Sequence, residues 1–322
     1  MMNILVTAVG SELSFSVIKA LKLVKFPFKL YGSDIHKEVV GKYWCDKFYQ
    51  VPLAANEAAY INRLKEIVQS EGITAIIPTN DIEILTLSRY TEDFLNTCNC
   101  LIIANAAKEV ERFNDKWLSY KWFHEHGIPC PLTYQLTDLM DPEGHLPDLS
   151  FPMILKPRIG GGSRSIFRIN SAEDLLKYSQ IMPDHLLQEY LYPDNEEYTA
   201  GVYRTKIDEV FVIILKRTLK FGMTNTAETV FDSDLENFVK LSILKTNLSG
   251  SVNVQFRLTD QGPMVLEINP RFSGTTGIRA NFGFNDVEMS INELILNHKL
   301  AQPDIKKGFV LRYFEEQYHF DT

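Results

Sequence analysis

Two β-patterned segments in the last third of the sequence carry a set of oxygen-bearing side chains. Ser251–Arg257 and Met264–Gly274 are joined by a short stretch with Asp, Gly and Pro, which predicts a β-hairpin. Glu267 and Asn269 are two positions apart, so along a strand they point to the same face, and Gln255 can meet them from the partner strand. Oxygen ligands of this kind suit Mg²⁺ far better than zinc.

Arg271 follows this set two positions after Asn269, and we expect it on the same side. Its planar guanidinium group could hold a transferring phosphoryl group or a carboxylate in a fork. A buried structural polar cluster is the alternative interpretation. It is the weaker one, because an unpaired carboxylate inside a sheet is costly.

A second segment, Phe151–Ile166, combines an apolar strand, a lysine and a glycine-rich turn. Lys156 ends the strand, Gly160, Gly161 and Gly162 follow, and Ser163 comes next. Glycines allow backbone N–H groups to close on phosphate oxygens, while the lysine adds a compact positive charge. The lysine precedes the glycines, so the segment is not a P-loop, and a flexible hairpin is the alternative.

A third segment, Leu186–Leu191, is an apolar strand that ends in polar groups and could form a hinge between two lobes. The backbone of such a hinge can read the edge of an adenine. Glu197 lies six to eight residues further on, beside a new strand at Tyr198–Tyr203, and could accept both ribose hydroxyls. The alternative is that Glu196 and Glu197 are solvated charges at a strand end.

The first third of the sequence alternates strands with helices. Periodicity predicts helices at Ser14–Leu23 and Ala58–Ser70. Strands are predicted at Asn3–Val9, Phe28–Tyr31, Phe48–Val51, Ala75–Ile77 and Leu101–Ile103. This order indicates parallel βαβ units and a small doubly wound domain that ends near residue 105. A further helix is expected from Lys108 to His126.

A dinucleotide site in this domain is the main rival hypothesis. Asp34 follows the second strand and could bind a ribose, but the first turn, from Ala8 to Glu12, contains only Gly10. The turn therefore lacks the glycines that a tight turn and a close approach to a pyrophosphate require.

Composition restricts the class of protein. The 322 residues are 45% hydrophobic and 23% charged, with a net charge of −8. Basic clusters are missing, so nucleic acid is not an expected partner. The N-terminus lacks a basic segment typical of a signal peptide, and the apolar run Val210–Leu215 is too short to cross a membrane. We therefore expect a soluble cytoplasmic protein whose four cysteines are free thiols.

The order of these motifs resembles the ATP-grasp superfamily. The hairpin motifs Asn253–Phe256 and Glu267–Arg271 are especially similar to those in the large subunit of carbamoyl-phosphate synthetase and its single-module relatives. The resemblance implies magnesium ligands at Gln255, Glu267 and Asn269. It implies catalytic roles for Arg271 and Lys156. It also implies ATP-binding roles for Lys116, Lys156, Gly161, Gly162, Ser163, Glu189, Tyr190, Leu191 and Glu197.

The resemblance further implies a mixed α/β and α+β fold. A doubly wound domain at residues 1–105 would precede a helical linker and one ATP-grasp lobe at 106–188, and a second lobe at 189–322. The expected reaction is activation of a carboxylate by ATP as an acyl phosphate, followed by attack of an amine, giving ADP and phosphate. Mg²⁺ is the expected metal, with Mn²⁺ as an alternative. The expected partners are small-molecule carboxylate and amine substrates and no membrane, and a homodimer is left open.

Two departures and two alternatives accompany this expectation. Ser165 stands where many relatives have the last glycine of the phosphate loop. Only one ATP-grasp module is present, so carbamoyl phosphate is not the expected product. The alternatives are a carbamoyl-phosphate-synthetase-like subunit that needs a partner and a non-catalytic ATP-binding protein.

Overall fold

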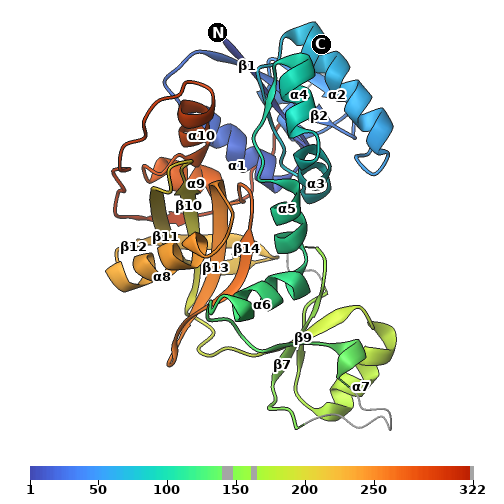
Figure 1. Cartoon of the computed structure of the whole chain (residues 1–322), viewed down its shortest axis with the longest axis vertical. Coiled ribbons are helices and arrows are strands. Elements are labelled where there is room, and N and C mark those ends of the chain that lie inside the picture. Colours follow the sequence, from blue (N-terminus) through green and yellow to red (C-terminus); the bar gives the residue numbers. More distant parts are fainter. Residues whose placement is uncertain (140–147, 161–164, 320–322) are drawn as a thin grey trace.

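The computed structural model describes residues 1–139, 148–160 and 165–319. Three sheets follow one another along the chain: a parallel sheet of five strands, an antiparallel sheet of four and an antiparallel sheet of six. The parallel sheet lies at one end of the long axis and the four-stranded sheet at the other, with the six-stranded sheet between them (Figure 1).

The parallel sheet forms the first domain, and its strand order is β3-β2-β1-β4-β5. Its strands are β1 (Met2–Val6), β2 (Phe28–Asp34), β3 (Lys47–Gln50), β4 (Ala75–Ile77) and β5 (Leu101–Ile102). Its helices are α1 (Glu12–Leu21), the 3₁₀ helix η1 (Val40–Trp44), α2 (Glu57–Glu71), α3 (Asp81–Ser88) and α4 (Thr91–Cys98). The predicted doubly wound domain is confirmed.

Both faces of this sheet are covered by helices, which explains why Ile4, Leu5 and Val6 of β1 are all fully buried. Ile4 and Val6 of β1 belong to the core that includes Ile18 of α1, whereas Leu5 packs into the core that includes Leu64 of α2. Successive side chains on a strand point to opposite faces, and each face here meets a helix.

The predicted helix from Lys108 to His126 is divided into α5 (Ala107–Asn114) and α6 (Lys116–Glu125). Asp115 breaks the helix, with φ −96° and ψ 110°, because its carboxylate caps α6 by accepting from the N–H groups of Trp117 and Leu118. Side-chain oxygens of Asp compete with helical hydrogen bonds in this way. Lys116 is therefore the first residue of α6.

The four-stranded sheet forms the small lobe and has the order β6-β9-β7-β8. Its elements are β6 (Thr133–Gln135), the 3₁₀ helix η2 (Leu136–Asp138), β7 (Met153–Pro157), β8 (Phe167–Ile169), α7 (Ala172–Ile181) and β9 (His185–Glu189). Met153, Leu155 and Leu187 pack into one apolar core with Leu175 of α7. The other face of the sheet is free to meet the large lobe.

The six-stranded sheet forms the large lobe, with the order β14-β13-β10-β11-β12-β15. Its strands are β10 (Glu197–Arg204), β11 (Val210–Lys220), β12 (Met223–Val230), β13 (Gly250–Thr259), β14 (Gly262–Asn269) and β15 (Phe309–Leu311). Its helices are α8 (Ser233–Leu244), α9 (Thr276–Asn281) and α10 (Asp286–Leu294). Tyr198, Ala200 and Val202 of β10 pack on one face in a core that includes Val239 of α8. Glu197 and Thr199 alternate with them on the opposite face.

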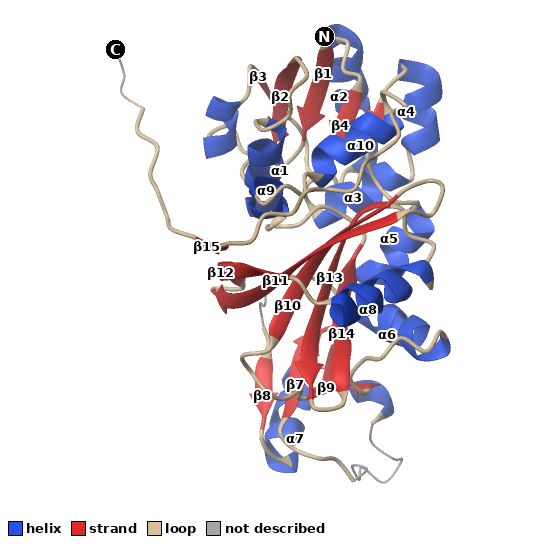
Figure 2. Ribbon diagram, turned by 90° about the vertical axis from the view of Figure 1, so that its left-hand side faces the viewer, coloured by secondary structure: helices blue, strands red, loops and turns tan. Residues whose placement is uncertain are grey.

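Helix packing holds the first domain and the large lobe together, in addition to the covalent continuity of the chain. Helices α9 and α10 pack against α1, so the C-terminal part of the chain contacts the N-terminal domain (Figure 2). Val287 and Ile291 of α10 belong to the same core as Val17 of α1. In the described part of the chain, no helix combines the length and the hydrophobicity that crossing a bilayer requires.

Candidate functional site

A cavity of about 350 Å³ lies between the small and the large lobe. Its wall includes predicted site residues from six separate segments of the chain, namely Lys116, Lys156, Glu189, Tyr190, Leu191, Glu197, Gln255 and Glu267. The fold therefore brings together most of the residues that the motifs single out. Arg271 and Asn269 are not among the residues that line this cavity.

Two lysines line this cavity close to Glu267. Lys156 is buried, and its Nζ donates to the side-chain oxygen of Gln188 at 2.8 Å. Lys116 Nζ lies 3.8 Å from the Glu267 carboxylate and donates to the carbonyl of Gly160. The pKa of Lys156 is lowered to about 8, mainly by burial; the Glu267 carboxylate opposes this shift, and the positive charge of Lys116 contributes to it. An anionic ligand here would favour the charged form of Lys156.

The glycine-rich turn begins at the end of the small lobe that meets α6. Gly160 has φ +105°, and the carbonyl of Arg158 accepts from the backbone N–H of Lys116 at 3.1 Å. Gly161, Gly162 and Ser163 lie outside the described residues. Ser165 has φ +57°, a left-handed conformation that glycine adopts at lower cost. The backbone at Ser165 therefore explains why glycine suits this position.

The polar side chains of the hinge segment are hydrogen-bonded within the protein. The Glu189 carboxylate accepts from the N–H of Leu132 at 3.2 Å, and the Tyr190 hydroxyl donates to Asp194 at 2.7 Å. Both side chains are thus engaged in protein contacts. In the main chain of this segment, the N–H of Glu189 donates to the Leu132 carbonyl at 2.8 Å, and the Leu191 carbonyl accepts from Arg257 at 2.9 Å.

Apolar side chains that the motifs did not single out complete the hinge end of the cavity. Ile154, Ile166, Leu219 and Leu266 line it. Ile154 and Lys156 are two positions apart on β7, so the alternation of side chains along that strand could have predicted that Ile154 lies on the same face as Lys156. Leu266 lies where the ladder between β13 and β14 shifts register, which alternation alone does not predict.

Glu197 is held by two arginines of the large lobe and is not a freely solvated charge. Arg217 Nη2 lies 2.9 Å from Oε1 of Glu197, and Arg257 Nη2 lies 3.0 Å from Oε2. Arg257 also donates to the carbonyl of Leu191 at 2.9 Å, which ties this carboxylate to the hinge. An ionised carboxylate can accept about four hydrogen bonds, and Glu197 accepts three from these arginines, so it keeps capacity for a ligand hydroxyl. Neither arginine was predicted as a site residue.

The predicted magnesium ligands share one face of the sheet. Gln255 pairs directly with Glu267, and Asn269 pairs with Asn253, two positions along the same ladder. The oxygen atoms of this set fit Mg²⁺, and one carboxylate with two amides would leave coordination positions for phosphate oxygens and water. Within the described residues, no three His, Cys, Asp or Glu side chains form a metal-binding group. The side-chain oxygen of Gln255 also accepts from Arg217 Nη2 at 2.9 Å.

Arg271 lies beyond the end of β14 and, like Asn269, is not among the residues that line the cavity, so its expected place beside the metal ligands stays a prediction. Strand β14 ends at Asn269, and the N–H of Arg271 bonds back to the Asn269 carbonyl at 2.8 Å. This three-residue turn ends the alternation of side chains. Arg271 instead pairs with Asp81 of α3 and lines a second cavity of about 340 Å³ at the junction with the first domain.

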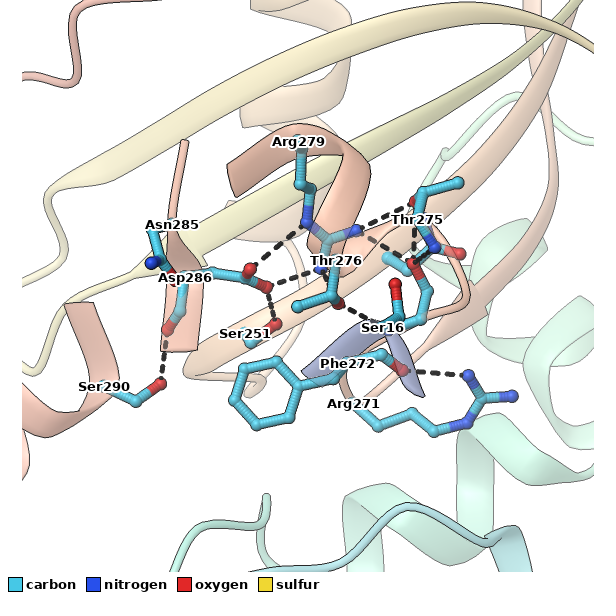
Figure 3. A network of polar contacts seen from close by, with 12 residues as sticks. Ser16, Ser251, Arg271, Phe272, Thr275, Thr276, Arg279, Asn285, Asp286 and Ser290 are labelled. Atoms are coloured by element: carbon cyan, nitrogen blue, oxygen red, sulfur yellow. Dashed lines mark hydrogen bonds and ion pairs between the residues drawn. The ribbon is translucent and has the colours of Figure 1, made fainter. Parts of the chain in front are cut away.

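The segment that follows Arg271 is fixed by a fully buried ion pair between Arg279 and Asp286 (Figure 3). Arg279 also donates to the hydroxyls of Ser273, Thr275 and Thr276. A Cβ atom at Gly201 would lie 2.4 Å from the Arg279 side chain, so only glycine leaves room for this arginine against the sheet. Sequence reasoning missed this network, because an isolated arginine in a short helix carries no pattern.

Comparisons with known proteins support this geometry. The model of the ATP-grasp domain family matches residues 113–275, which is half of the chain, and that of the PylC-like N-terminal domain matches residues 4–102. An uncharacterized protein of Methanocaldococcus jannaschii is 25% identical over 209 residues. That match covers 62% of this chain and 50% of the relative, so the chain aligns with about half of that protein's length.

Solved structures share the fold at low sequence identity. N5-carboxyaminoimidazole synthetase from Staphylococcus aureus, complexed with ADP, has a TM-score of 0.73 at 16% identity, covering 94% of this chain and 79% of that one. The biotin carboxylase domain of 2-oxoglutarate carboxylase from Hydrogenobacter thermophilus, complexed with MgADP, has a TM-score of 0.73 at 17% identity, covering 96% and 73%. L-amino acid ligase from Bacillus licheniformis has a TM-score of 0.71 at 14% identity, covering 91% and 74%. At these identities the likeness establishes the fold.

Proposed function

The chain belongs to the ATP-grasp family, and we propose that it is an ATP-dependent ligase that activates a carboxylate as an acyl phosphate. The observation that carries this proposal is the cavity between the lobes. It combines two lysines, one carboxylate opposite an amide, and a hinge segment with apolar walls. These are the groups needed for phosphates, a metal and a purine, respectively.

Each end of the cavity has its own task in this proposal. The main chain at Glu189–Leu191 and the apolar side chains Ile154 and Leu266 hold the adenine, and Glu197 accepts from the ribose hydroxyls. Lys116 and Lys156 bind phosphate oxygens. Gln255, Glu267 and Asn269 hold Mg²⁺, which supplies charge neutralisation at the phosphates when it is bound.

The proposed reaction has two steps. A carboxylate oxygen of the substrate attacks the γ-phosphorus, the bond from phosphorus to the ADP oxygen breaks, and an acyl phosphate forms with release of ADP. An amine then attacks the acyl carbon, phosphate leaves, and the amine loses a proton. The two lysines stabilise negative charge on the moving phosphoryl group and orient it.

The acceptor carboxylate is proposed to bind where the first domain meets the large lobe. Arg271 and Asp81 lie there, and the guanidinium group of Arg271 can bind a carboxylate in a fork. The solved relatives named above include an L-amino acid ligase and a carboxyaminoimidazole synthetase. The substrates that we propose for this chain are a small-molecule carboxylate and a small-molecule amine.

A second candidate is a non-catalytic ATP-binding protein. The specific observation that favours it is the position of Arg271, which pairs with Asp81 and does not line the cavity between the lobes. A carbamoyl-phosphate-synthetase-like subunit that needs a partner is a variant of the ligase proposal. For either candidate we propose a cytoplasmic protein that acts on small molecules without nucleic acid or membrane, and a homodimer stays a prediction.

Release of ADP separates the two candidates. Purified protein with MgATP is assayed across a panel of carboxylic acids and amino acids, with hydroxylamine present to trap an acyl phosphate as hydroxamate. A ligase releases ADP and forms hydroxamate only when its acid is present. Protein that binds MgATP but yields neither product with any acid supports the non-catalytic candidate.

A further inference from the structure

Arg217 links two parts of the proposed nucleotide site that lie far apart in the sequence. Its Nη2 atom donates to Oε1 of Glu197 at 2.9 Å and to Oε1 of Gln255 at 2.9 Å. Its Nε atom donates to the same oxygen of Glu197 at 3.2 Å. One guanidinium group therefore contacts both the carboxylate proposed for the ribose and an amide proposed for the metal.

The strand register makes this contact a property of the sheet. Tyr198 pairs with Lys216, so Glu197 and Arg217 occupy the next position and share the opposite face. Thr199 pairs with Gln255 on the other side of β10. The side chain of Arg217 is 8% exposed, and it lines the cavity between the lobes. Its contacts are thus made inside the proposed site.

Neutralising Glu197 does not by itself require Arg217. Arg257 pairs with the other oxygen of Glu197 at 3.0 Å and bonds to the Leu191 carbonyl. The contact that distinguishes Arg217 from Arg257 is the one to Gln255. A role of Arg217 beyond charge balance must therefore lie in that second contact.

We infer that Arg217 is a positioning residue that couples ribose binding at Glu197 to metal binding at Gln255. This inference rests on the proposed function. A guanidinium group is planar and its donors have fixed directions, so ordering of Glu197 by ribose hydroxyls also orders the Gln255 amide. The Gln255 oxygen has two lone pairs and can ligate a metal while it still accepts from Arg217. Each ligand then favours binding of the other, which is a coupling free energy.

The neighbouring residue provides a matched control. Lys216 precedes Arg217 on β11 and pairs with Glu196, just as Arg217 pairs with Glu197. Side chains at successive positions point to opposite faces, and Lys216 is not among the residues that line the cavity. Lys216→Met removes a comparable cross-strand ion pair outside the proposed site.

The test measures how much Mg²⁺ strengthens ADP binding. Calorimetric titrations give the ratio of nucleotide affinities with and without Mg²⁺, here called the Mg²⁺ factor, for wild type, Arg217→Met, Arg217→Lys and Lys216→Met. A second series repeats these titrations with 2′,3′-dideoxy-ADP, which lacks both ribose hydroxyls, in place of ADP. Arg217→Lys keeps a positive charge beside Glu197, and it provides a second variant for the measurement if Arg217→Met folds poorly. We expect both Arg217 variants to lower the Mg²⁺ factor for ADP about fivefold or more, and Lys216→Met to keep it. Loss of the hydroxyls should lower the factor in wild type but not in the Arg217 variants.

Three results overturn the inference, and the last is distinguishable from the first two. Wild type that binds ADP but shows the same Mg²⁺ factor for both nucleotides, or Arg217 variants that keep the wild-type factor for ADP, overturn the coupling role alone. Wild type that binds neither nucleotide overturns the proposed function and the inference with it.

Discussion

Arg271 forms an ion pair with Asp81, with 2.6 Å between Nε and Oδ1, across the boundary between the large lobe and the first domain. Asp81 is the first residue of α3, and Arg271 follows β14 and its proposed metal-binding motif. The pair therefore connects the end of the proposed metal site to the domain proposed to hold the acceptor. In the proposed function, the acid is thus positioned outside the cavity proposed for ATP, which is a separation of two tasks.

Arg271→Lys tests this separation. The variant keeps the charge but loses the fork, and Arg271 does not line the cavity between the lobes. We expect MgATP affinity to stay at the wild-type value while ADP release with the acid substrate falls by about 10²-fold, the scale for loss of one preorganised donor. Calorimetry and steady-state kinetics give the two numbers. Weakened ATP binding with unaltered turnover per bound ATP would contradict the assignment.

Lys156→Met should weaken binding of MgADP by about 1.5–3 kcal/mol, the scale of a lost charge-assisted hydrogen bond. Binding should also depend on pH, because burial lowers the pKa of Lys156 to about 8 in the free protein. A bound phosphate favours the protonated form, so wild-type affinity should fall as pH rises above about 8, by up to about tenfold per unit. Titrations at several pH values check this. An equal pH dependence in Lys156→Met would assign the effect to another group.

Glu267→Gln should suppress turnover and leave the fold unchanged. The carboxylate is the one acidic side chain in the predicted metal set, and it faces Lys116 at 3.8 Å. The amide has the same shape but removes the negative charge that attracts Mg²⁺. We expect the Mg²⁺ concentration needed for half-maximal ADP binding to rise at least about tenfold, with a wild-type melting temperature in the absence of ligand. A wild-type Mg²⁺ requirement would remove Glu267 from the metal site.

Glu83 makes the first domain sensitive to pH. It is 4% exposed, accepts from the Thr7 hydroxyl at 2.5 Å, and burial raises its pKa from 4.5 to about 7. The folded state thus binds this proton more tightly than the unfolded chain. Its stabilising effect is complete below about pH 4.5 and is lost as pH rises to about 7.

Glu83→Gln removes this dependence, because the amide is neutral at every pH and can still accept from Thr7. Relative to wild type, the variant should gain free energy of unfolding between pH 5 and pH 8, by up to about 3 kcal/mol. Urea unfolding of both proteins at the two pH values measures the difference. A constant difference across this range would mean that Glu83 titrates normally in the folded protein.

Local patterns predicted the elements that lie within the core. Ala75–Ile77 has the predicted bounds, and α2 differs from the predicted Ala58–Ser70 by one residue at each end. Apolar runs and helical periodicity reflect burial, which is a property of neighbouring residues. The break at Asp115 could not be seen in this way, because it depends on a cap and on an ion pair with Arg158, 43 residues away.

The same limit applies to the site. Glu267 and Gln255 could be placed together from alternation across one predicted hairpin, and the ladder pairs them directly. Arg217 could not, because its position beside Glu197 depends on the register of β10 and β11. The place of Arg271 beside these ligands stays a prediction, because it extends the alternation past Asn269, where the strand ends. Motif spacing describes a strand only as far as the strand continues.

Transfer of ¹⁸O from the acceptor carboxylate to phosphate tests the central claim most directly. The acid that gives the highest ADP release is labelled with ¹⁸O in its carboxyl group, and the phosphate formed with MgATP and amine is analysed by mass spectrometry. The account predicts one ¹⁸O atom per phosphate released, because the oxygen that attacks the γ-phosphorus leaves with it when the amine attacks the acyl carbon. Phosphate that carries no ¹⁸O, with ADP released at the same rate, would show that water attacks ATP directly and would contradict the ligase proposal.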